Sequence, residues 1–115
     1  MSRKRPKAIA VKRKAPARVF AALGDETRLS LVARLSRGQP RSISQLTEGS
    51  RLTRQAITKH LRVLERAEIV HHVHAGRESL FVFDPEPLEA LKGYLERVSA
   101  QWDEALARLK SFVEK

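Results

Sequence analysis

The chain has 115 residues, enough for one domain with a modest hydrophobic core, and a formal net charge of +10. It contains no cysteine, which excludes disulfides, thiolate metal sites and a cysteine nucleophile. No apolar run approaches the roughly 18–20 residues of a membrane span and no secretory segment is visible. We therefore expect a cytoplasmic protein without a membrane partner.

The positive charge is concentrated in two parts of the chain. Residues 1–14 hold seven Lys and Arg and no acidic residue, and residues 28–77 hold ten Lys and Arg against three Glu. Residues 84–115 hold seven acidic and five basic residues. A basic middle region favours a polyanionic partner over a merely solvated surface. We predict a disordered basic arm over residues 1–14, which contacts DNA phosphates or serves solubility, and a folded domain over residues 15–115.

Two helices are predicted in the first part of this domain. A short helix should run from Ala17 to Leu23 and stop at Gly24. Asp25 is the expected N-cap of the second helix, because its carboxylate can accept a backbone N–H of the first turn. Gly38 and Pro40 should end that helix. Its predicted buried stripe consists of Leu29, Val32, Ala33 and Leu35.

The next segment has the pattern of a helix-turn-helix. Ser44 is the predicted N-cap of a very short helix over residues 45–48, and residues 49–51 form a tight turn. A longer basic helix follows, which completes the motif. Because any three-helix core contains similar turns, the pattern alone is only moderately specific. Ile43, just before the short helix, is expected to pair with a later hairpin.

The basic helix is predicted over residues 52–70, with Thr53 as its N-cap. Ile57, Leu61 and Leu64 recur at helical spacing and form its buried stripe. The opposite face carries hydrogen-bond donors, crowded into the N-terminal half: Arg54, Gln55, Thr58, Lys59, Arg62 and Arg66. Arg and Gln can bond guanine and adenine edges through paired contacts, so this face suits the major groove of DNA. The alternative is the solvated face of an ordinary amphipathic helix.

A β-hairpin is predicted after Val70, where the apolar period changes from helical spacing toward alternation. Residues 71–75 and 78–83 read as two strands joined at Gly76 and Arg77. A two-stranded ribbon directly behind a basic helix is a wing. Arg77, at its tip, should lie over the phosphates or the minor groove of DNA.

Three histidines on the first strand, His71, His72 and His74, raise the question of a metal site. On a strand, His72 and His74 share one face and His71 points away. Two imidazoles without a cysteine or a fixed carboxylate make an incomplete zinc site, so we predict polar strand residues. No phosphate-binding loop, nucleophile elbow or paired-carboxylate arrangement is present. We expect no metal, no cofactor and no enzymatic activity.

The last predicted helix opens at residues 84–87, where Pro near its start and acidic side chains suit its N-terminal end. Its apolar residues alternate three and four apart and form a seam: Leu88, Leu91, Leu95, Val98, Trp102, Ala105, Leu109 and Phe112. About 25 residues of helix reach roughly 38 Å, which exceeds so small a domain. Part of the seam should therefore contact a second copy, through Leu91, Leu95, Val98, Trp102 and Leu109. Packing wholly on its own domain is the alternative.

The sequence resembles the arsenic-repressor-like (ArsR-type) winged-helix transcription regulators. The residues that carry the resemblance are 20–28 (Phe-Ala-Ala-Leu-Gly-Asp-Glu-Thr-Arg), 52–64 (Leu-Thr-Arg-Gln-Ala-Ile-Thr-Lys-His-Leu-Arg-Val-Leu) and the wing tip, 76–78. It covers about residues 16–113, and its motifs are specific together although each alone is weak. The resemblance implies a homodimer that pairs through its first and last helices and represses by occupying a palindromic operator.

Two departures from that family bear on sensing. Many members bind metals through a Cys-x-Cys pair on the short helix before the turn, where this chain has residues 44–48 (Ser-Gln-Leu-Thr-Glu). Others place His ligands along the last helix, which has none here. The sequence of residues 102–110 is similar to that of a branch of this family without cysteine sensors. Metal-dependent release is therefore not implied, and no motif specifies the chemistry of an effector.

These observations predict a mainly α fold with a small β-hairpin, namely a winged helix-turn-helix with a long C-terminal dimerisation helix. The expected function is sequence-specific transcription regulation, as a homodimeric repressor on double-stranded DNA. Base and nearby phosphate contacts are assigned to Thr53, Arg54, Gln55, Thr58 and Lys59, and backbone contacts to Arg62 and Arg77. The alternative is a sequence-indifferent architectural DNA- or RNA-binding protein. A regulator should prefer its operator over random DNA by roughly 10³ or more.

Overall fold

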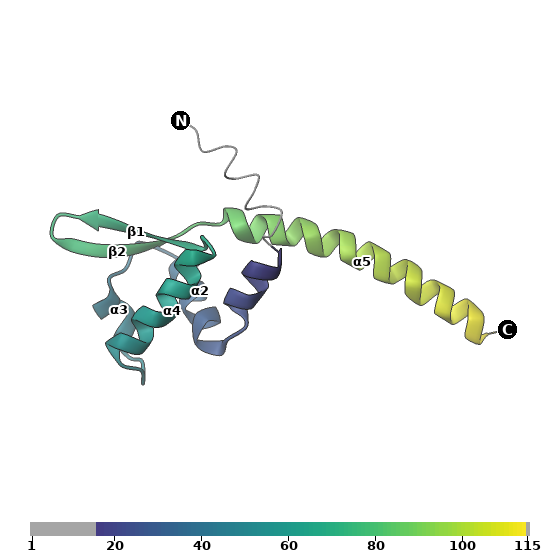
Figure 1. Ribbon diagram of the computed structural model, residues 1–115, viewed down its shortest axis with the longest axis horizontal. Coiled ribbons are helices and arrows are strands. Elements are labelled where there is room, and N and C mark those ends of the chain that lie inside the picture. The colour runs from purple at the N-terminus through teal and green to yellow at the C-terminus, as the bar shows by residue number, and fades with distance from the viewer. Residues whose placement is uncertain (1–15, 115) are drawn as a thin grey trace, which may run out of the picture.

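The structure, a computed structural model, describes residues 16–114 (Figure 1). A helical segment over residues 16–23 precedes the labelled elements. These are α2 (Glu26–Ser36), α3 (Ile43–Thr47), α4 (Arg54–Arg66), β1 (Val70–Ala75), β2 (Glu78–Phe83) and α5 (Glu86–Val113). This is the mainly helical winged helix-turn-helix that the sequence predicts. The expected basic arm, residues 1–14, lies outside the described residues.

The core lies between the helical segment, α2, α3, α4 and the base of the hairpin. Leu46, Leu61 and Leu64 are completely buried there. Full burial of a leucine side chain stabilises the fold by about 1.5–3 kcal/mol. The stripe predicted for α2 was wrong in part: Leu29 is 52% exposed and Ala33 is exposed. The face that enters the core consists of Leu31, Val32 and Leu35.

The start of α3 also differs from the prediction. Its N-cap is Ser42 rather than Ser44, because Ser42 and Gln45 form a reciprocal capping box. The Gln45 N–H donates to the Ser42 hydroxyl (3.1 Å), and the Ser42 N–H donates to the Gln45 side-chain oxygen (2.9 Å). Ile43 is consequently the first helical residue and does not pair with the hairpin. Arg41 makes that pairing instead, through two backbone hydrogen bonds with Phe81.

The helix α4 is shorter than predicted, since it ends at Arg66 rather than near residue 70. Glu68 adopts a left-handed conformation with φ 63°. Its N–H donates to the Glu65 carbonyl and the Ile69 N–H donates to the Leu64 carbonyl, which is the Schellman arrangement at a helix C-terminus. This turn buries Ile69 and Val70 completely and starts β1.

The two strands form the predicted antiparallel hairpin. Val70 pairs with Phe83 at its base and Ala75 with Glu78 at its tip. Gly76 has φ +65°, a conformation that glycine adopts without steric cost, and it opens the two-residue turn to Arg77. The wing therefore joins α4 to α5 as expected.

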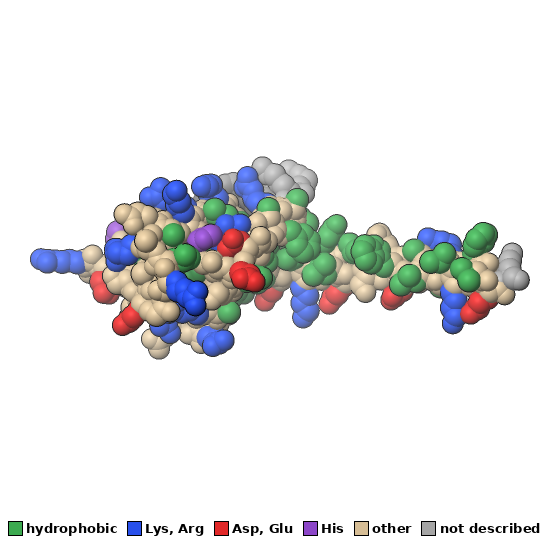
Figure 2. Space-filling model, turned by 90° about the horizontal axis from the view of Figure 1, so that it is seen from below, with side chains coloured by type: hydrophobic (Ala, Val, Ile, Leu, Met, Phe, Trp, Pro, Cys, Tyr) green, Lys and Arg blue, Asp and Glu red, His purple; other side chains and the backbone are tan. Residues whose placement is uncertain are grey.

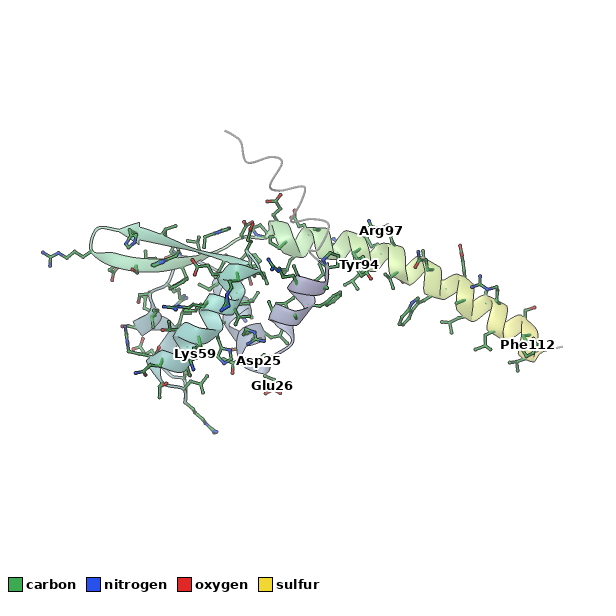
Figure 3. The ribbon with its side chains drawn as sticks, in the orientation of Figure 1. Asp25, Glu26, Lys59, Tyr94, Arg97 and Phe112 are labelled. Atoms are coloured by element: carbon green, nitrogen blue, oxygen red, sulfur yellow. The ribbon has the colours of Figure 1, made fainter. Side chains whose placement is uncertain are left out.

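The helix α5 projects from the opposite side of the body from the hairpin tip (Figure 1). Its first turns pack on the domain: Leu91 is buried, and the Tyr94 ring meets Phe20 edge-on at 6.3 Å. Beyond Val98, every residue of α5 is exposed. Figures 2 and 3 show apolar side chains along this projecting half, with Phe112 near its end. No helix within residues 16–114 is long and apolar enough to cross a membrane.

Candidate nucleic-acid interface

The orientation of α4 is set by its two faces. Ile57, Leu61 and Leu64 are buried against α2, α3 and β1. The N-terminus is fixed by Thr53, whose hydroxyl accepts the Ala56 N–H at 3.1 Å, as predicted. The polar face must then point away from the core.

A shallow hollow of about 430 Å³ lies on this outward face. Its lining residues are five of the seven predicted DNA contacts: Arg54, Gln55, Thr58, Lys59 and Arg62. Three of them are cationic and none is acidic, so the hollow attracts anions. Thr53 does not line it, because its side chain caps the helix behind it.

Two hydrogen bonds within the hollow were not anticipated from sequence. The Arg54 Nη1 donates to the Ser44 hydroxyl at 2.7 Å, and the Thr58 hydroxyl donates to the Arg54 carbonyl at 2.7 Å. The Thr58 proton is thereby committed to the backbone, which leaves its oxygen to accept. Arg54 retains four of its five N–H donors.

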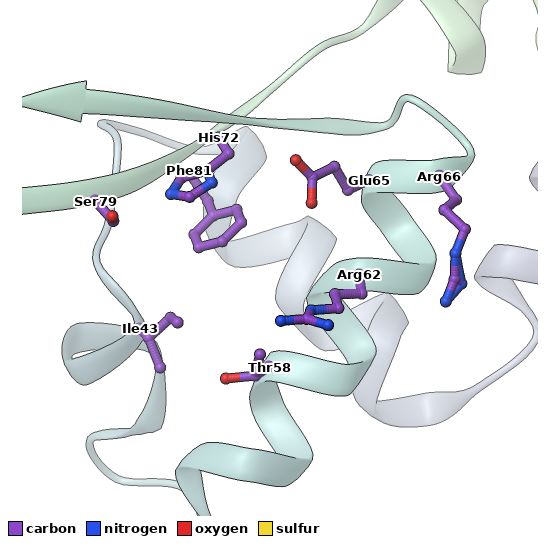
Figure 4. Close-up of a pocket in the computed structure, with 8 residues that line it drawn as sticks. All are labelled: Ile43, Thr58, Arg62, Glu65, Arg66, His72, Ser79 and Phe81. Atoms are coloured by element: carbon purple, nitrogen blue, oxygen red, sulfur yellow. The ribbon is translucent and has the colours of Figure 1, made fainter.

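A deeper cleft of about 480 Å³ separates α4 from the hairpin (Figure 4). Thr58 and Arg62 line both the hollow and this cleft. On the hairpin side, the His72 ring stacks on Phe81 with centroids 4.9 Å apart. The full lining comprises Ile43, Thr58, Arg62, Glu65, Arg66, His72, Ser79 and Phe81. Of these residues, Thr58 and Arg62 were predicted from sequence to contact DNA, and nothing in the sequence singled out Ser79.

Arg77 stands apart from the hollow. It lies in the turn at the far end of the hairpin, with an exposed side chain. The structure thus brings five predicted contact residues together on α4 and leaves Arg77 as a separate cation at the wing tip.

Behind α4, a polar cluster joins three helices. The Arg28 guanidinium donates to the Ala22 carbonyl (2.6 Å) and reaches Nδ1 of His60 (3.2 Å). The Asp25 carboxylate accepts the Arg28 N–H (3.0 Å) and lies 3.8 Å from His60. The Arg28 backbone hydrogen bond lowers the pKa of Asp25 below its ordinary value, and the charges of His60 and Arg28 add to this effect. His60, on α4, is thus packed against α2.

Known proteins share this architecture. Residues 23–73 match the family model of a helix-turn-helix domain. The HTH-type transcriptional regulator Rv2034 of Mycobacterium tuberculosis is 33% identical over 101 residues, which span 88% of this chain and 91% of the relative. The structure of an ArsR-like transcriptional regulator from Rhodococcus sp. RHA1 aligns with a TM-score of 0.75 at 38% identity, over 87% of this chain and 93% of that one. The chain belongs to the ArsR family of helix-turn-helix transcriptional regulators.

This family membership confirms the resemblance seen in the sequence and makes the protein a DNA-binding transcription regulator, not an enzyme. A more distant structure, the homodimeric winged helix-turn-helix DNA-binding domain of Mb0332 from Mycobacterium bovis, shares the fold. It aligns with a TM-score of 0.58 at 20% identity, over 93% of each chain.

The chain has no cysteine. Within the described part of the chain, no group of three or more His, Asp or Glu side chains is arranged to hold a metal ion. His72 and His74 share a strand face, with ring centroids 5.1 Å apart, as predicted. His71 points elsewhere and its Nε2 lies 2.7 Å from the carboxylate of Asp84, two residues before α5 begins.

Proposed function

We propose that this ArsR-family regulator is a repressor that binds a palindromic operator as a homodimer and reads bases with the N-terminal half of α4. The observation that carries the proposal is the outward hollow, which gathers Arg54, Gln55, Thr58 and Lys59 and has no acidic residue in its own lining. Arg and Gln offer paired hydrogen bonds to guanine and adenine, and Lys59 offers a cation to bases or phosphates. Thr53 fixes the helix terminus that enters the groove and lies close to the DNA backbone there.

Arg62 and Arg77 are assigned to the DNA backbone. Arg62 lies on the border between the hollow and the cleft below the wing, beyond the turn that carries Arg54 and Gln55. Arg77 lies at the wing tip, where it can reach phosphates or the minor groove beside the recognition helix. These contacts hold the protein in register without reading sequence directly.

Dimerisation is assigned to the apolar seam of α5. Leu91 packs on the domain, whereas Leu95, Trp102 and Leu109 are 46%, 67% and 56% exposed. Val98 lies between them and is half-buried. Leu106 and Val113, which the predicted seam omitted, are also exposed on α5. So long an apolar stripe is costly to leave in water, and a second copy related by a two-fold axis can cover it.

Comparison of operator and random duplexes tests the proposal. The purified protein should be footprinted on its own upstream DNA, and the protected site titrated beside a random duplex at several salt concentrations. A homodimeric repressor should prefer the operator by roughly 10³ or more, over half-sites about one helical turn apart. Equal affinity for both duplexes would instead identify a sequence-indifferent architectural protein.

A further inference from the structure

The side chain of Arg54 has a partner before any DNA arrives. Arg54 is the first residue of α4, and its Nη1 donates to the hydroxyl of Ser44, ten residues earlier on α3, at 2.7 Å. Both residues are exposed, and a small hollow between α3 and α4 is lined by them together with Gln45, Thr47 and Glu48. The bond therefore crosses from one helix of the helix-turn-helix to the other.

The helix that carries Ser44 is held at both ends. The capping box of Ser42 and Gln45 closes its N-terminus. At the other end, the Arg34 guanidinium on α2 donates to the Leu46 carbonyl (2.9 Å) and to the Gln45 carbonyl (3.1 Å). These bonds satisfy backbone carbonyls that a five-residue helix leaves unpaired. Ser44 is consequently a fixed point on the body of the domain.

We propose that Ser44 is a positioning residue that holds Arg54 in the orientation required for base reading. The inference rests on the base contact proposed above for Arg54. An exposed arginine samples many rotamers, and their loss on binding weakens a contact by about 2- to 10-fold. Ser44 restricts Arg54 in advance and uses one of its five N–H donors. The remaining four include the pair needed for a bidentate guanine contact.

Operator titrations of Ser44→Ala, Arg54→Ala and the double variant test this role. The DNA set should contain the operator and all its single-base variants. Ser44→Ala should lose about 2- to 10-fold on the operator and flatten the preference at the base pair where Arg54→Ala also flattens it. In the Arg54→Ala background, Ser44→Ala should cost nothing further, because a positioning residue acts only through its partner.

Two matched variants serve as controls. Ser44→Thr keeps the hydroxyl and should restore both affinity and base preference. Ser36→Ala removes a hydroxyl that donates to the Ala33 carbonyl of its own helix, and it should leave DNA binding unchanged. Thermal unfolding of each variant should match the wild type. A readout without DNA is the ¹⁵N relaxation of the Arg54 guanidinium, whose order parameter should fall in Ser44→Ala and not in Ser36→Ala.

The possible failures are distinct from one another. Additive losses in the double variant, or an equal loss on every sequence, would make Ser44 a direct backbone contact and overturn the positioning role. The positioning role would also be overturned if Arg54→Ala altered the base preference while Ser44→Ala changed neither the base preference nor the order parameter of the Arg54 guanidinium. If the wild type itself shows no base preference, the proposed function fails and the inference fails with it.

Discussion

Trp102 is the side chain on which the proposed dimer depends most. It is 67% exposed on the projecting half of α5, so it contributes little to the stability of its own domain. A tryptophan side chain can bury up to about 250 Å², of which roughly 160 Å² would remain for a partner to cover. At about 25 cal/mol per Å², this area is worth about 4 kcal/mol per protomer.

The Trp102→Ala variant should therefore dissociate. A loss of about 4 kcal/mol raises the dissociation constant of the dimer by roughly a thousandfold, even if only one of the two tryptophans realises its full contact. DNA affinity should fall as well, although Trp102 lies far from the hollow, because a single winged helix buries too little DNA for tight specific binding. Thermal unfolding of the monomeric domain should change little.

Sedimentation at micromolar concentration, beside operator titrations, measures both effects. Glu104→Ala is the matched control, since Glu104 is two residues further along α5 and lies away from the seam. It should leave assembly and DNA binding intact. A wild-type monomer at that concentration, or a Trp102→Ala variant that stays dimeric with full affinity, would refute the link between α5 and DNA binding.

Three further predictions concern the interface and the fold. Arg54→Ala should cost about 1–3 kcal/mol of binding free energy on the operator and less on random DNA, and equal losses on both duplexes would contradict its base contact. Arg77→Ala should instead weaken binding to all sequences alike and lower the slope of the salt dependence by about one. Glu68→Gly should raise the free energy of unfolding by about 1 kcal/mol in urea titration, because glycine relieves the φ of 63°, while Glu68→Ala should not. Because folding lowers the pKa of Asp25, its ionised carboxylate stabilises the fold at pH values above its ordinary pKa of 3.8. This contribution is lost as the pH falls below 3.8 and through the lowered pKa of the folded state. The stability difference between wild type and Asp25→Asn should accordingly shrink in acid denaturation, and a difference that stays constant with pH would exclude the linkage.

Features encoded by neighbouring residues were predicted correctly from sequence. The N-caps Asp25 and Thr53 each need one side chain three residues before the N–H that it accepts. The stripe of Ile57, Leu61 and Leu64 is a strong helical period, and Gly76 marks the turn of the hairpin. Such signals lie within one element and do not depend on the rest of the fold.

The errors arise where two local readings compete. Both Ser42 and Ser44 can cap a helix, and Gln45 favours Ser42 because a Gln three residues after a serine completes a capping box. That signal was present in the sequence and was missed. No local signal tells that Leu31 rather than Leu29 is the buried leucine of α2, because its burial depends on the position of core residues from other helices, such as Leu46 and Leu61. The hydrogen bonds of Arg34 and Ser44 likewise join separate helices, so no periodic pattern within one helix predicts them.

The helical segment at residues 16–23 links the two surfaces to which dimerisation and DNA reading are assigned in the proposed function. Phe20 of this segment meets Tyr94 at the root of α5. Arg28 joins the C-terminal end of the same segment to His60 on α4, through the Ala22 carbonyl on one side and the imidazole on the other. The helix α4 and the root of α5 therefore contact the same segment, residues 16–23, within one protomer. In a two-fold dimer, the crossing of the two α5 helices then sets the separation of the two hollows. Under the proposed function, the half-site spacing of the operator should therefore depend on the α5 seam, while the base sequence of each half-site should depend on α4.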